Sequence, residues 1–569
     1  MSPKGRPEGE YRSEKREGSP VSLRARVGGD ALPWLALAAV ALVAGAWLRA
    51  RGLSAQIVID DEWHALHKLL RADMLDVVTH LDYADYSIPL TVYFRWLHDT
   101  VGVTEWGMRA PMLAAGIVLV VAAPALARAW APPPVRAAWT VLLAVSPLLV
   151  YFSRTARPYA LTALLATVAL IAFERWYRGD RRRDAWGALY VAATFVAGWL
   201  HMTSLAFVLL PFAYFGVRAL RAGGGEPLRR LVRMGIATAL PLLLALAPPV
   251  VNDWFMFTAK AGVDSVTLAS AGRTALMLAG SAHAVVALLL GLAAAAGFAR
   301  FWRRDRVLAG YLLTVTIGGT LAIVAARPNW VQHPLVFARY LVPVLPLLLL
   351  LAAEGALALV TPLARVPVAG AAVAAMAGLA LWHFGPLPAL GPEPNQFTGH
   401  LRHQFDYDDA HNPYVRQVPQ EPVPAFYREL AKSRPGSLTV IEAPWRLESH
   451  HNPHVWYQQV HRQHVLIGLV TPLCGVSRFG EYPETQAGMR LANFAHVSAL
   501  LRGNTYGADF LIMHLAPWST PPDAKVPWPD VAACLPAIEA ALGPPFYRDE
   551  RIVVFALPDD RRPGPARAK

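Results

Sequence analysis

The sequence predicts a polytopic α-helical membrane protein with about eleven spanning helices and a C-terminal α/β domain. The 569 residues are 55% hydrophobic and 16% charged, whereas soluble domains carry about 25% charged residues. Apolar runs close to the roughly 20 residues that cross a bilayer recur through the first two thirds of the chain. Arginines gather in short clusters between these runs, which is the pattern of loops on the cytoplasmic side of a membrane.

Composition divides the chain into three parts. Residues 1–30 are polar and basic, and we expect a disordered cytoplasmic tail there. Residues 31–384 contain the apolar runs and form the predicted transmembrane domain. Residues 385–569 begin with a stretch rich in Pro, His and Asp, which indicates a linker before a soluble domain. The net charge of +13 lies in the inter-helix clusters, so it does not indicate nucleic-acid binding.

An odd number of spans would place the two ends of the chain on opposite sides of the membrane. Trp and Arg at the ends of a run can anchor in the interface, so runs somewhat shorter than 20 residues still qualify. The predicted spans are 33–48, 108–127, 138–152, 158–173, 185–200, 203–217, 234–251, 282–300, 307–326, 340–359 and 367–384.

Charge predicts the orientation of these spans. Three arginine-rich loops fall on the side of the basic N-terminal tail when the spans alternate, and that side is cytoplasmic under the positive-inside rule. The C-terminal part then lies outside the cytoplasm. The three clusters are Arg175, Arg178, Arg181, Arg182 and Arg183; Arg218, Arg221, Arg229, Arg230 and Arg233; and Arg300, Arg303, Arg304 and Arg306.

The apolar stretch from Trp186 to Val217 is compatible with one long helix or two short ones. We favour two, because the polar groups of His201, Thr203 and Ser204 interrupt it. One long helix would reverse the orientation of everything downstream and spoil the charge pattern.

The first external loop, residues 49–107, has its own amphipathic pattern. The segment Glu62–Asp76 places Trp63 and several leucines on one helical face, which is typical of a helix lying in the membrane interface. The segment Tyr86–His98 predicts a second such helix that opens near Pro89.

Beyond residue 385, short β-like runs alternate with helical patterns, which predicts a small α/β domain of about 150 residues. The two cysteines, Cys474 and Cys534, are compatible with a disulfide, which is permitted outside the cytoplasm, and equally with two unpaired thiols. The predicted strands are 438–441, 465–467, 510–513 and 552–555, and the predicted helices include Val423–Lys432 and Val531–Leu542.

Acidic residues in the first loop are the first candidates for chemistry. Asp60, Asp61 and Glu62 follow the first span, where partial burial would raise the pKa of a carboxyl group toward that of a general base. Asp82 and Asp85 lie next to aromatic residues, and such a pair can hydrogen-bond sugar hydroxyls or hold a divalent cation. A solvated acidic patch would also explain Asp60, Asp61 and Glu62. An ordinary helix start would also explain Asp82 and Asp85.

Basic residues on the external side are the second group of candidates. Arg154 and Arg157 occupy a link of a few residues before Tyr159, and Arg339-Tyr340 begins a Pro-rich span. Arginine on the external side opposes the usual bias of positive charge toward the cytoplasm. A lipid phosphate would explain these residues, because the guanidinium group matches its geometry. Side chains that reach lipid head groups would also explain them. His201 lies on an external turn, where it contacts substrate or serves the structure.

The C-terminal domain is rich in histidine. His450 and His454, and likewise His461 and His464, have spacings that suit metal ligands on a helix. No complete ligand motif is present, so we expect a solvated polar stretch and assign no metal ligands. The absence of a Walker or Rossmann glycine loop predicts no nucleotide cofactor, and a divalent cation is the one cofactor left open.

Taken in order, these motifs resemble the GT-C membrane glycosyltransferases, specifically the bacterial relatives of protein O-mannosyltransferases and of lipid A aminoarabinose transferases. The resemblance covers residues 33–384. Asp61-Glu62 matches the family's Asp-Glu pair, with Asp60 as an extra acidic neighbour. The segment Tyr86–Leu90 matches the Pro-Pro-Leu region, with Ile88 where the first proline is common.

Further matches lie in the basic motifs. Arg154, Arg157 and Tyr159 match the family's Arg-Pro-Tyr link, and Arg339-Tyr340 matches its late Arg-Tyr. The resemblance implies a polyprenyl-phosphate sugar as donor, an active site facing the periplasm of a bacterial inner membrane, and Asp61 as the catalytic base.

The sequence therefore predicts an inverting glycosyltransferase that moves a sugar from a polyprenyl phosphate to a hydroxyl of a lipid, glycan or protein. The alternative is a transporter or lipid flippase with an external acidic site. Transporters usually place ionisable residues near the bilayer midplane and are built from two related halves. Here the ionisable residues gather at one external face and no halves repeat, which favours the enzyme.

Overall fold

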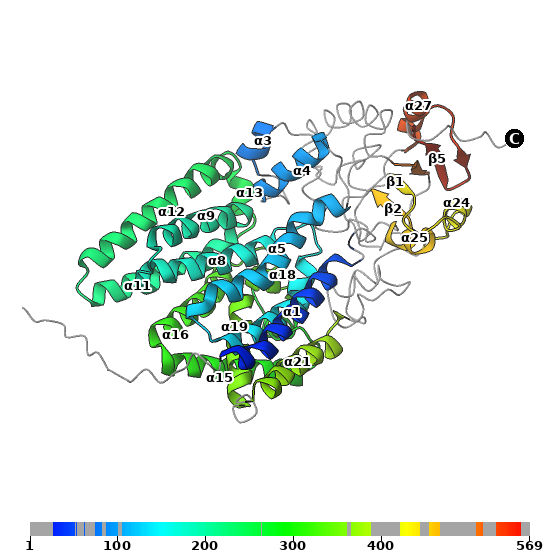
Figure 1. Cartoon of the computed structure of the whole chain (residues 1–569). Coiled ribbons are helices and arrows are strands. Elements are labelled where there is room, and N and C mark those ends of the chain that lie inside the picture. The colour runs from blue at the N-terminus through cyan, green and yellow to red at the C-terminus, as the bar shows by residue number, and fades with distance from the viewer. Residues whose placement is uncertain are drawn as a thin grey trace, which may run out of the picture.

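The computed structural model consists of a long helical bundle and a small mixed sheet near one of its ends (Figure 1). The sheet lies toward the end of the bundle where α3 (Met74–Thr79) and α4 (Ile88–Thr100) are found. The structure describes residues 27–51, 53, 62, 74–81, 87–100, 105–262, 264–360, 366–387, 421–443, 454–466, 508–515 and 531–558.

Each predicted span coincides with helix. Four of them are interrupted by a short turn or a change in helix type, so they carry two labels. The helices are α1 (Val27–Ala50), α5 (Glu105–Leu126), α6 (Pro133–Val145) with α7 (Pro147–Phe152), α8 (Tyr159–Arg178), α9 (Arg183–Leu200), α10 (Leu205–Val208) with α11 (Leu210–Arg221), α12 (Gly225–Asn252), α15 (Ala284–Arg304), α16 (Arg306–Leu313) with α17 (Gly319–Ala326), α18 (Pro334–Leu341) with α19 (Leu345–Leu359), and α21 (Pro367–Phe384).

Within the described residues, nine helical segments are long and apolar enough to cross a membrane, which agrees with a multi-pass membrane protein. Pro147 divides one further predicted span into α6 and α7, and Arg183 and Asp184 lower the mean hydropathy of α9. The buried share of each helix shows which helices lie at the centre of the bundle and which lie at its periphery. The most apolar window of α18–α19 is 83% buried, whereas those of α12 and α15 are 17% buried and expose leucine and valine, as lipid-facing helices do.

The stretch from Trp186 to Val217 forms two helical segments, as the charge pattern predicts. His201 has an extended backbone (φ −159°, ψ 104°) and ends α9. The chain then doubles back, because the Tyr190 hydroxyl donates to the Val208 carbonyl at 2.8 Å and the Tyr190 and Phe212 rings are 5.9 Å apart. The polar turn at His201 is thus the tip of a helical hairpin.

Part of the predicted first loop lies within the described residues. The helix expected at 86–98 is present as α4, and Trp96 on it is 53% exposed, as expected for an interfacial helix. The end of α3 is tied to the end of α12, since the Leu81 backbone N–H donates to Asp253 at 2.7 Å. Residues 63–73, which hold most of the other predicted helix, lie outside the described residues. Two further helices follow α12, namely α13 (Trp254–Thr258) and α14 (Leu268–Ala279).

A buried arginine fixes the end of α1 against the rest of the bundle. Arg49, which is fully buried, donates to the Leu143 and Ala144 carbonyls at 2.9 and 2.8 Å and to the Ser153 hydroxyl at 3.2 Å. These partners satisfy the guanidinium inside the protein, where an unpaired charge would be costly.

Close packing of α15 on α19 depends on two glycines. A Cβ atom at Gly297 would overlap the Leu351 carbonyl oxygen, and one at Gly355 would overlap the Ala293 carbonyl oxygen. The two backbones therefore approach more closely than any side chain allows, as at small-residue interfaces between membrane helices.

The described part of the C-terminal region forms a five-stranded sheet of order β2-β1-β3-β5-β4. β1 pairs in parallel with β2 and β3, and β5 pairs antiparallel with β3 and β4. All four predicted strands and both predicted helices are confirmed to within two residues at each end. The elements are β1 (Thr439–Ala443), β2 (His464–Leu466), β3 (Phe510–His514), β4 (Tyr547–Arg548) and β5 (Ile552–Ala556), with α24 (Ala425–Leu430), α25 (His454–His461) and α27 (Val531–Leu542).

Candidate functional site

A buried ion pair anchors the first loop. The Arg109 guanidinium, near the start of α5, donates through Nε and Nη2 to the two carboxylate oxygens of Glu62 at 2.8 and 2.7 Å. The Ala156 backbone N–H donates to the same carboxylate at 2.6 Å, and Arg109 also donates to the Leu53 carbonyl at 2.8 Å. Both side chains are buried. Glu62 thus joins the first loop to α5 and to the link before α8.

Four of the predicted acidic residues, Asp60, Asp61, Asp82 and Asp85, lie outside the described residues. Their roles therefore stay predictions. The described member of the acidic group, Glu62, has both oxygens engaged, which suits a positioning role better than proton transfer.

Arg154 caps the C-terminal end of α1. Its Nη1 atom donates to the carbonyls of Leu48 and Arg49, both at 3.1 Å, and of Arg51 at 2.6 Å. These carbonyls have no partner within the helix, so a cation at this position satisfies them and complements the helix dipole. Burial, followed by the charges of Arg109 and Arg51, lowers the pKa of Arg154 to about 10, and its guanidinium stays charged at neutral pH.

The remaining five predicted residues, Arg157, Tyr159, His201, Arg339 and Tyr340, lie together in the structure. The His201 ring is 5.3 Å from the Tyr159 ring and 5.8 Å from the Tyr340 ring. The Arg339 guanidinium lies 5.7 Å from the centre of the Tyr159 ring and 5.5 Å from that of Tyr340. We call these five residues the arginine–histidine cluster. They come from three places: the link before α8 with the first residue of that helix, the turn after α9, and α18 itself. Folding therefore brings three distant motifs together.

His201 is neutral in this cluster. Burial, and then the positive charges of Arg339 and Arg157, lowers the pKa of His201 to about 3. Its Nδ1 atom is hydrogen-bonded to the Thr203 hydroxyl. Arg157, His201 and Arg339 are each half-buried, so the cluster combines two cations and a neutral imidazole at a partly exposed surface.

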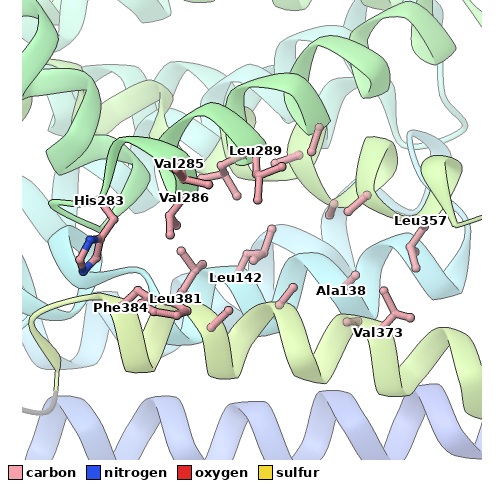
Figure 2. A pocket seen from close by; sticks show the side chains of 18 of the residues that line it. Ala138, Leu142, His283, Val285, Val286, Leu289, Leu357, Val373, Leu381 and Phe384 are labelled. Carbon is pink, nitrogen blue, oxygen red and sulfur yellow. The ribbon is translucent and has the colours of Figure 1, made fainter.

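A separate cavity of about 570 Å³ lies among α6, α15, α19 and α21 (Figure 2). Leu142, Val286, Leu289 and Leu381 point into it, and His283 and Phe384 lie at one end. The lining is apolar except for His283, so the cavity offers no set of groups for acid–base chemistry. Its chemistry suits a hydrocarbon chain.

The C-terminal histidines are arranged differently from the solvated stretch that the sequence predicts. His454 and His461 are fully buried, and they face Glu442 and His514, which sequence analysis did not single out. Glu442, His454 and His514 can each offer a ligand atom to one metal ion, and the burial of these histidines corrects the expectation of a solvated stretch. Glu442, His454 and His514 are far apart in the sequence, so no local motif reveals them. The one available signal is the spacing of His454 and His461, which lie seven residues apart on one face of a helix. His450 and Cys474 lie outside the described residues, as does the side chain of Cys534.

No protein-family model matches the chain, and no curated protein is similar enough in sequence to match. Solved structures do match. ArnT from Cupriavidus metallidurans in the apo state is 14% identical, with 92% of this chain and 98% of that chain covered at a TM-score of 0.50. The same protein bound to undecaprenyl phosphate is 15% identical, with 92% and 97% covered at a TM-score of 0.46.

An oligosaccharyltransferase from Archaeoglobus fulgidus, in complex with zinc and sulfate, is 13% identical, with 84% of this chain and 68% of that chain covered at a TM-score of 0.43. At these identities, the match to apo ArnT carries information on the fold alone, and it spans nearly the full length of both chains. The chain therefore has the polytopic helical fold of the GT-C membrane glycosyltransferases, with a small C-terminal α/β region.

Proposed function

We propose that this protein transfers a glycosyl group from a polyprenyl-phosphate-linked donor to an acceptor hydroxyl at the external, periplasmic face of the membrane. The observation that carries the proposal is the convergence of Arg157, His201 and Arg339 from three distant segments. Two guanidinium groups beside one neutral imidazole are suited to a phosphate group, which accepts hydrogen bonds on several oxygens.

The arginine–histidine cluster would bind the donor phosphate. Arg157 and Arg339 would neutralise the negative charge that grows on the phosphate oxygen as its bond to the sugar breaks, which is the largest electrostatic contribution expected at such a site. Neutral His201 would donate one hydrogen bond without adding charge, and Tyr159 and Tyr340 would flank the phosphate or the sugar ring. Arg154, engaged by the carbonyls of α1, would hold the link in position.

Asp61 would act as the general base. Its carboxylate would take the proton of the acceptor hydroxyl while the acceptor oxygen bonds to C1 of the sugar and the C1–phosphate bond breaks. This single displacement inverts the configuration at C1 and releases polyprenyl phosphate. Asp61 is covalently bonded to Glu62, so the Arg109–Glu62 ion pair would fix the loop that carries the base. Asp60 is an alternative base, and Asp82 and Asp85 would bind sugar hydroxyls.

The fold supports the proposed donor. ArnT from C. metallidurans, whose fold this chain shares, binds undecaprenyl phosphate, a polyprenyl phosphate. The basic loops at the opposite end of the bundle support a cytoplasmic N-terminus and a periplasmic site in a bacterial inner membrane.

The test is sugar transfer in membranes supplied with radiolabelled polyprenyl-phosphate sugars. Wild type is compared with Asp61→Asn and with Arg339→Gln. The matched control is Arg303→Gln, because Arg303 is an exposed arginine at the end of α15, away from the cluster. We expect transfer by wild type and the control, and its loss in the other two variants at equal membrane content.

Three outcomes would contradict the proposal or one of its parts. Transfer that survives in Asp61→Asn would move the base to another acid, and unchanged transfer in Arg339→Gln would remove the cluster from the site. If wild type consumes none of the donors while a labelled lipid crosses the bilayer, the protein is a transporter.

A further inference from the structure

The C-terminal sheet brings a carboxylate and two histidines to one place. β1 and β3 are parallel neighbours in which Glu442 pairs with Ile512. Side chains alternate across a strand, so His514, two residues beyond Ile512, lies on the same face as Glu442. Both residues are near the carboxyl ends of their strands, and α25 contributes His454 from its first turn.

The three side chains are in direct contact. The Nδ1 atom of His454 is 2.7 Å from Oε2 of Glu442, and the Nε2 atom of His514 is 3.0 Å from the same oxygen. One nitrogen or oxygen of each residue lies within 4.8 Å of the others. Their side chains are at most 2% exposed. Such a small, buried set of donors is the arrangement that a metal ion needs.

No lysine or arginine among the described residues pairs with the buried Glu442 carboxylate. Its ion pairs with described residues are all to histidine. A buried net charge is costly unless a cation compensates it.

His461 completes the cluster in a different role. The Gln463 backbone N–H donates to Nδ1 of His461 at 3.0 Å, so the proton of the neutral ring is on Nε2. That Nε2–H faces Oε1 of Glu442 at 3.7 Å, too far for a hydrogen bond, and neither atom has another hydrogen-bond partner among the described residues. His461 is therefore a donor toward the carboxylate and not a metal ligand, and Oε1 is an acceptor that lacks a close partner among the described residues.

We propose that Glu442, His454 and His514 bind one divalent first-row transition-metal ion, with zinc expected. Two imidazoles and one carboxylate form a ligand set that zinc uses in proteins. The ion would place a fixed positive charge beside the buried carboxylate and would join β1, β3 and α25, which contribute one ligand each. Its place in the C-terminal sheet makes it independent of the arginine–histidine cluster and of the proposed sugar transfer.

The test is the metal content of the full-length chain, purified in detergent through a tag that contains no histidine. Elemental mass spectrometry should find about one zinc ion per wild-type chain. We expect at least a tenfold loss in His454→Asn, His514→Gln and Glu442→Gln. The matched control is His464→Gln, a half-buried histidine in β2 of the same sheet, which should keep its metal.

A second measurement uses wild type alone and does not depend on the folding of variants. A chelator should lower the Tm, added Zn²⁺ should restore it, and Co²⁺ added to the metal-free chain should give the visible absorption of a bound, low-symmetry ion that Zn²⁺ then removes. Wild type that retains less than about a tenth of an ion per chain after exposure to Zn²⁺ would overturn the proposal. Equal loss of metal in His464→Gln would overturn the assigned ligands.

Discussion

Arg109 holds both carboxylate oxygens of Glu62 in a fully buried ion pair, and the two residues are 47 positions apart in the chain. The pair connects the loop after the first span to the helix that begins the second. Its energetic role differs from that of a surface ion pair, because neither charge can be solvated if the other is removed.

Glu62→Gln should therefore destabilise the protein strongly. The substitution leaves the Arg109 charge buried without its counter-charge, at a cost of about 3–5 kcal/mol. Thermal unfolding in detergent measures the loss. Glu226→Gln is the control, since the Glu226–Arg230 pair at the start of α12 is exposed and is worth about 0–1 kcal/mol. A similar small effect in both variants would contradict the role given to the buried pair.

Arg339→Lys should weaken donor binding while the protein stays folded. A lysine keeps the charge but loses the forked donors that match phosphate, which costs about 1.5–3 kcal/mol for hydrogen bonds to a charged group. We expect the donor KM to rise about tenfold to a hundredfold. Steady-state transfer assays measure it, with Arg303→Lys as the matched control. An unchanged KM would show that Arg339 does not contact the phosphate.

Arg154→Met should act on stability rather than on the donor. The variant keeps much of the side-chain volume and removes the guanidinium that caps α1, with an expected loss of about 1.5–3 kcal/mol. The donor KM of the variant that remains folded should stay close to that of wild type. A rise in KM as large as in Arg339→Lys, at unchanged Tm, would instead place Arg154 at the phosphate.

Acid should destabilise the protein through His201. The pKa of His201 is about 3 in the folded chain, whereas the unfolded chain binds a proton at the ordinary value of about 6.5. Between these values the unfolded state binds more protons, so this contribution to stability is lost as pH falls. Tm measured from about pH 7 to pH 5 should fall less in His201→Gln than in wild type. His383→Gln, at an exposed position in α21, is the control and should retain the slope of wild type.

Gly297→Ala should impair folding, although alanine favours helix. Its Cβ would overlap the Leu351 carbonyl oxygen across the α15–α19 interface, and overpacking costs about 1–3 kcal/mol or more. Gly291→Ala is the control on the same helix, because its Cβ meets no atom within 4 Å, and it should leave stability unchanged or raised by up to about 1 kcal/mol. Yields of monodisperse protein and Tm together measure the effect. Equal behaviour of the two variants would contradict the close packing.

Much of the fold follows from local sequence. The apolar runs and the polar turn at His201 predict the helices because each span satisfies its own backbone hydrogen bonds. The strands in the C-terminal region are likewise short apolar runs between turns. The break at Pro147 is harder to predict from sequence. A proline that begins a new helix and a proline inside a continuous helix both lie within an apolar run.

The sites depend on contacts that local patterns do not contain. Arg157 and Arg339 are recognisable one by one because each is an arginine on the external side, and His201 because it interrupts an apolar stretch. The structure adds their convergence. Arg109 was not predicted, since an arginine at the start of an apolar run looks like an ordinary interfacial anchor. Glu442 and His514 are single polar residues within buried strands, so only strand register brings them to His454.

The buried Arg49 has a consequence for how the chain is made. Its carbonyl partners Leu143 and Ala144 are 94 and 95 residues further along, so they leave the ribosome about 5–20 s later at usual synthesis rates. During that delay only the Gly45 carbonyl, one turn earlier in the same helix, is available among the described acceptors of Arg49, and a charged side chain is costly inside the bilayer. The nascent helix should therefore sit with Arg49 at the lipid–water boundary and move to its final depth only after α6 is inserted. The membrane domain should therefore assemble in a fixed order, in which α1 enters the membrane first but reaches its final packing only after α6 is present.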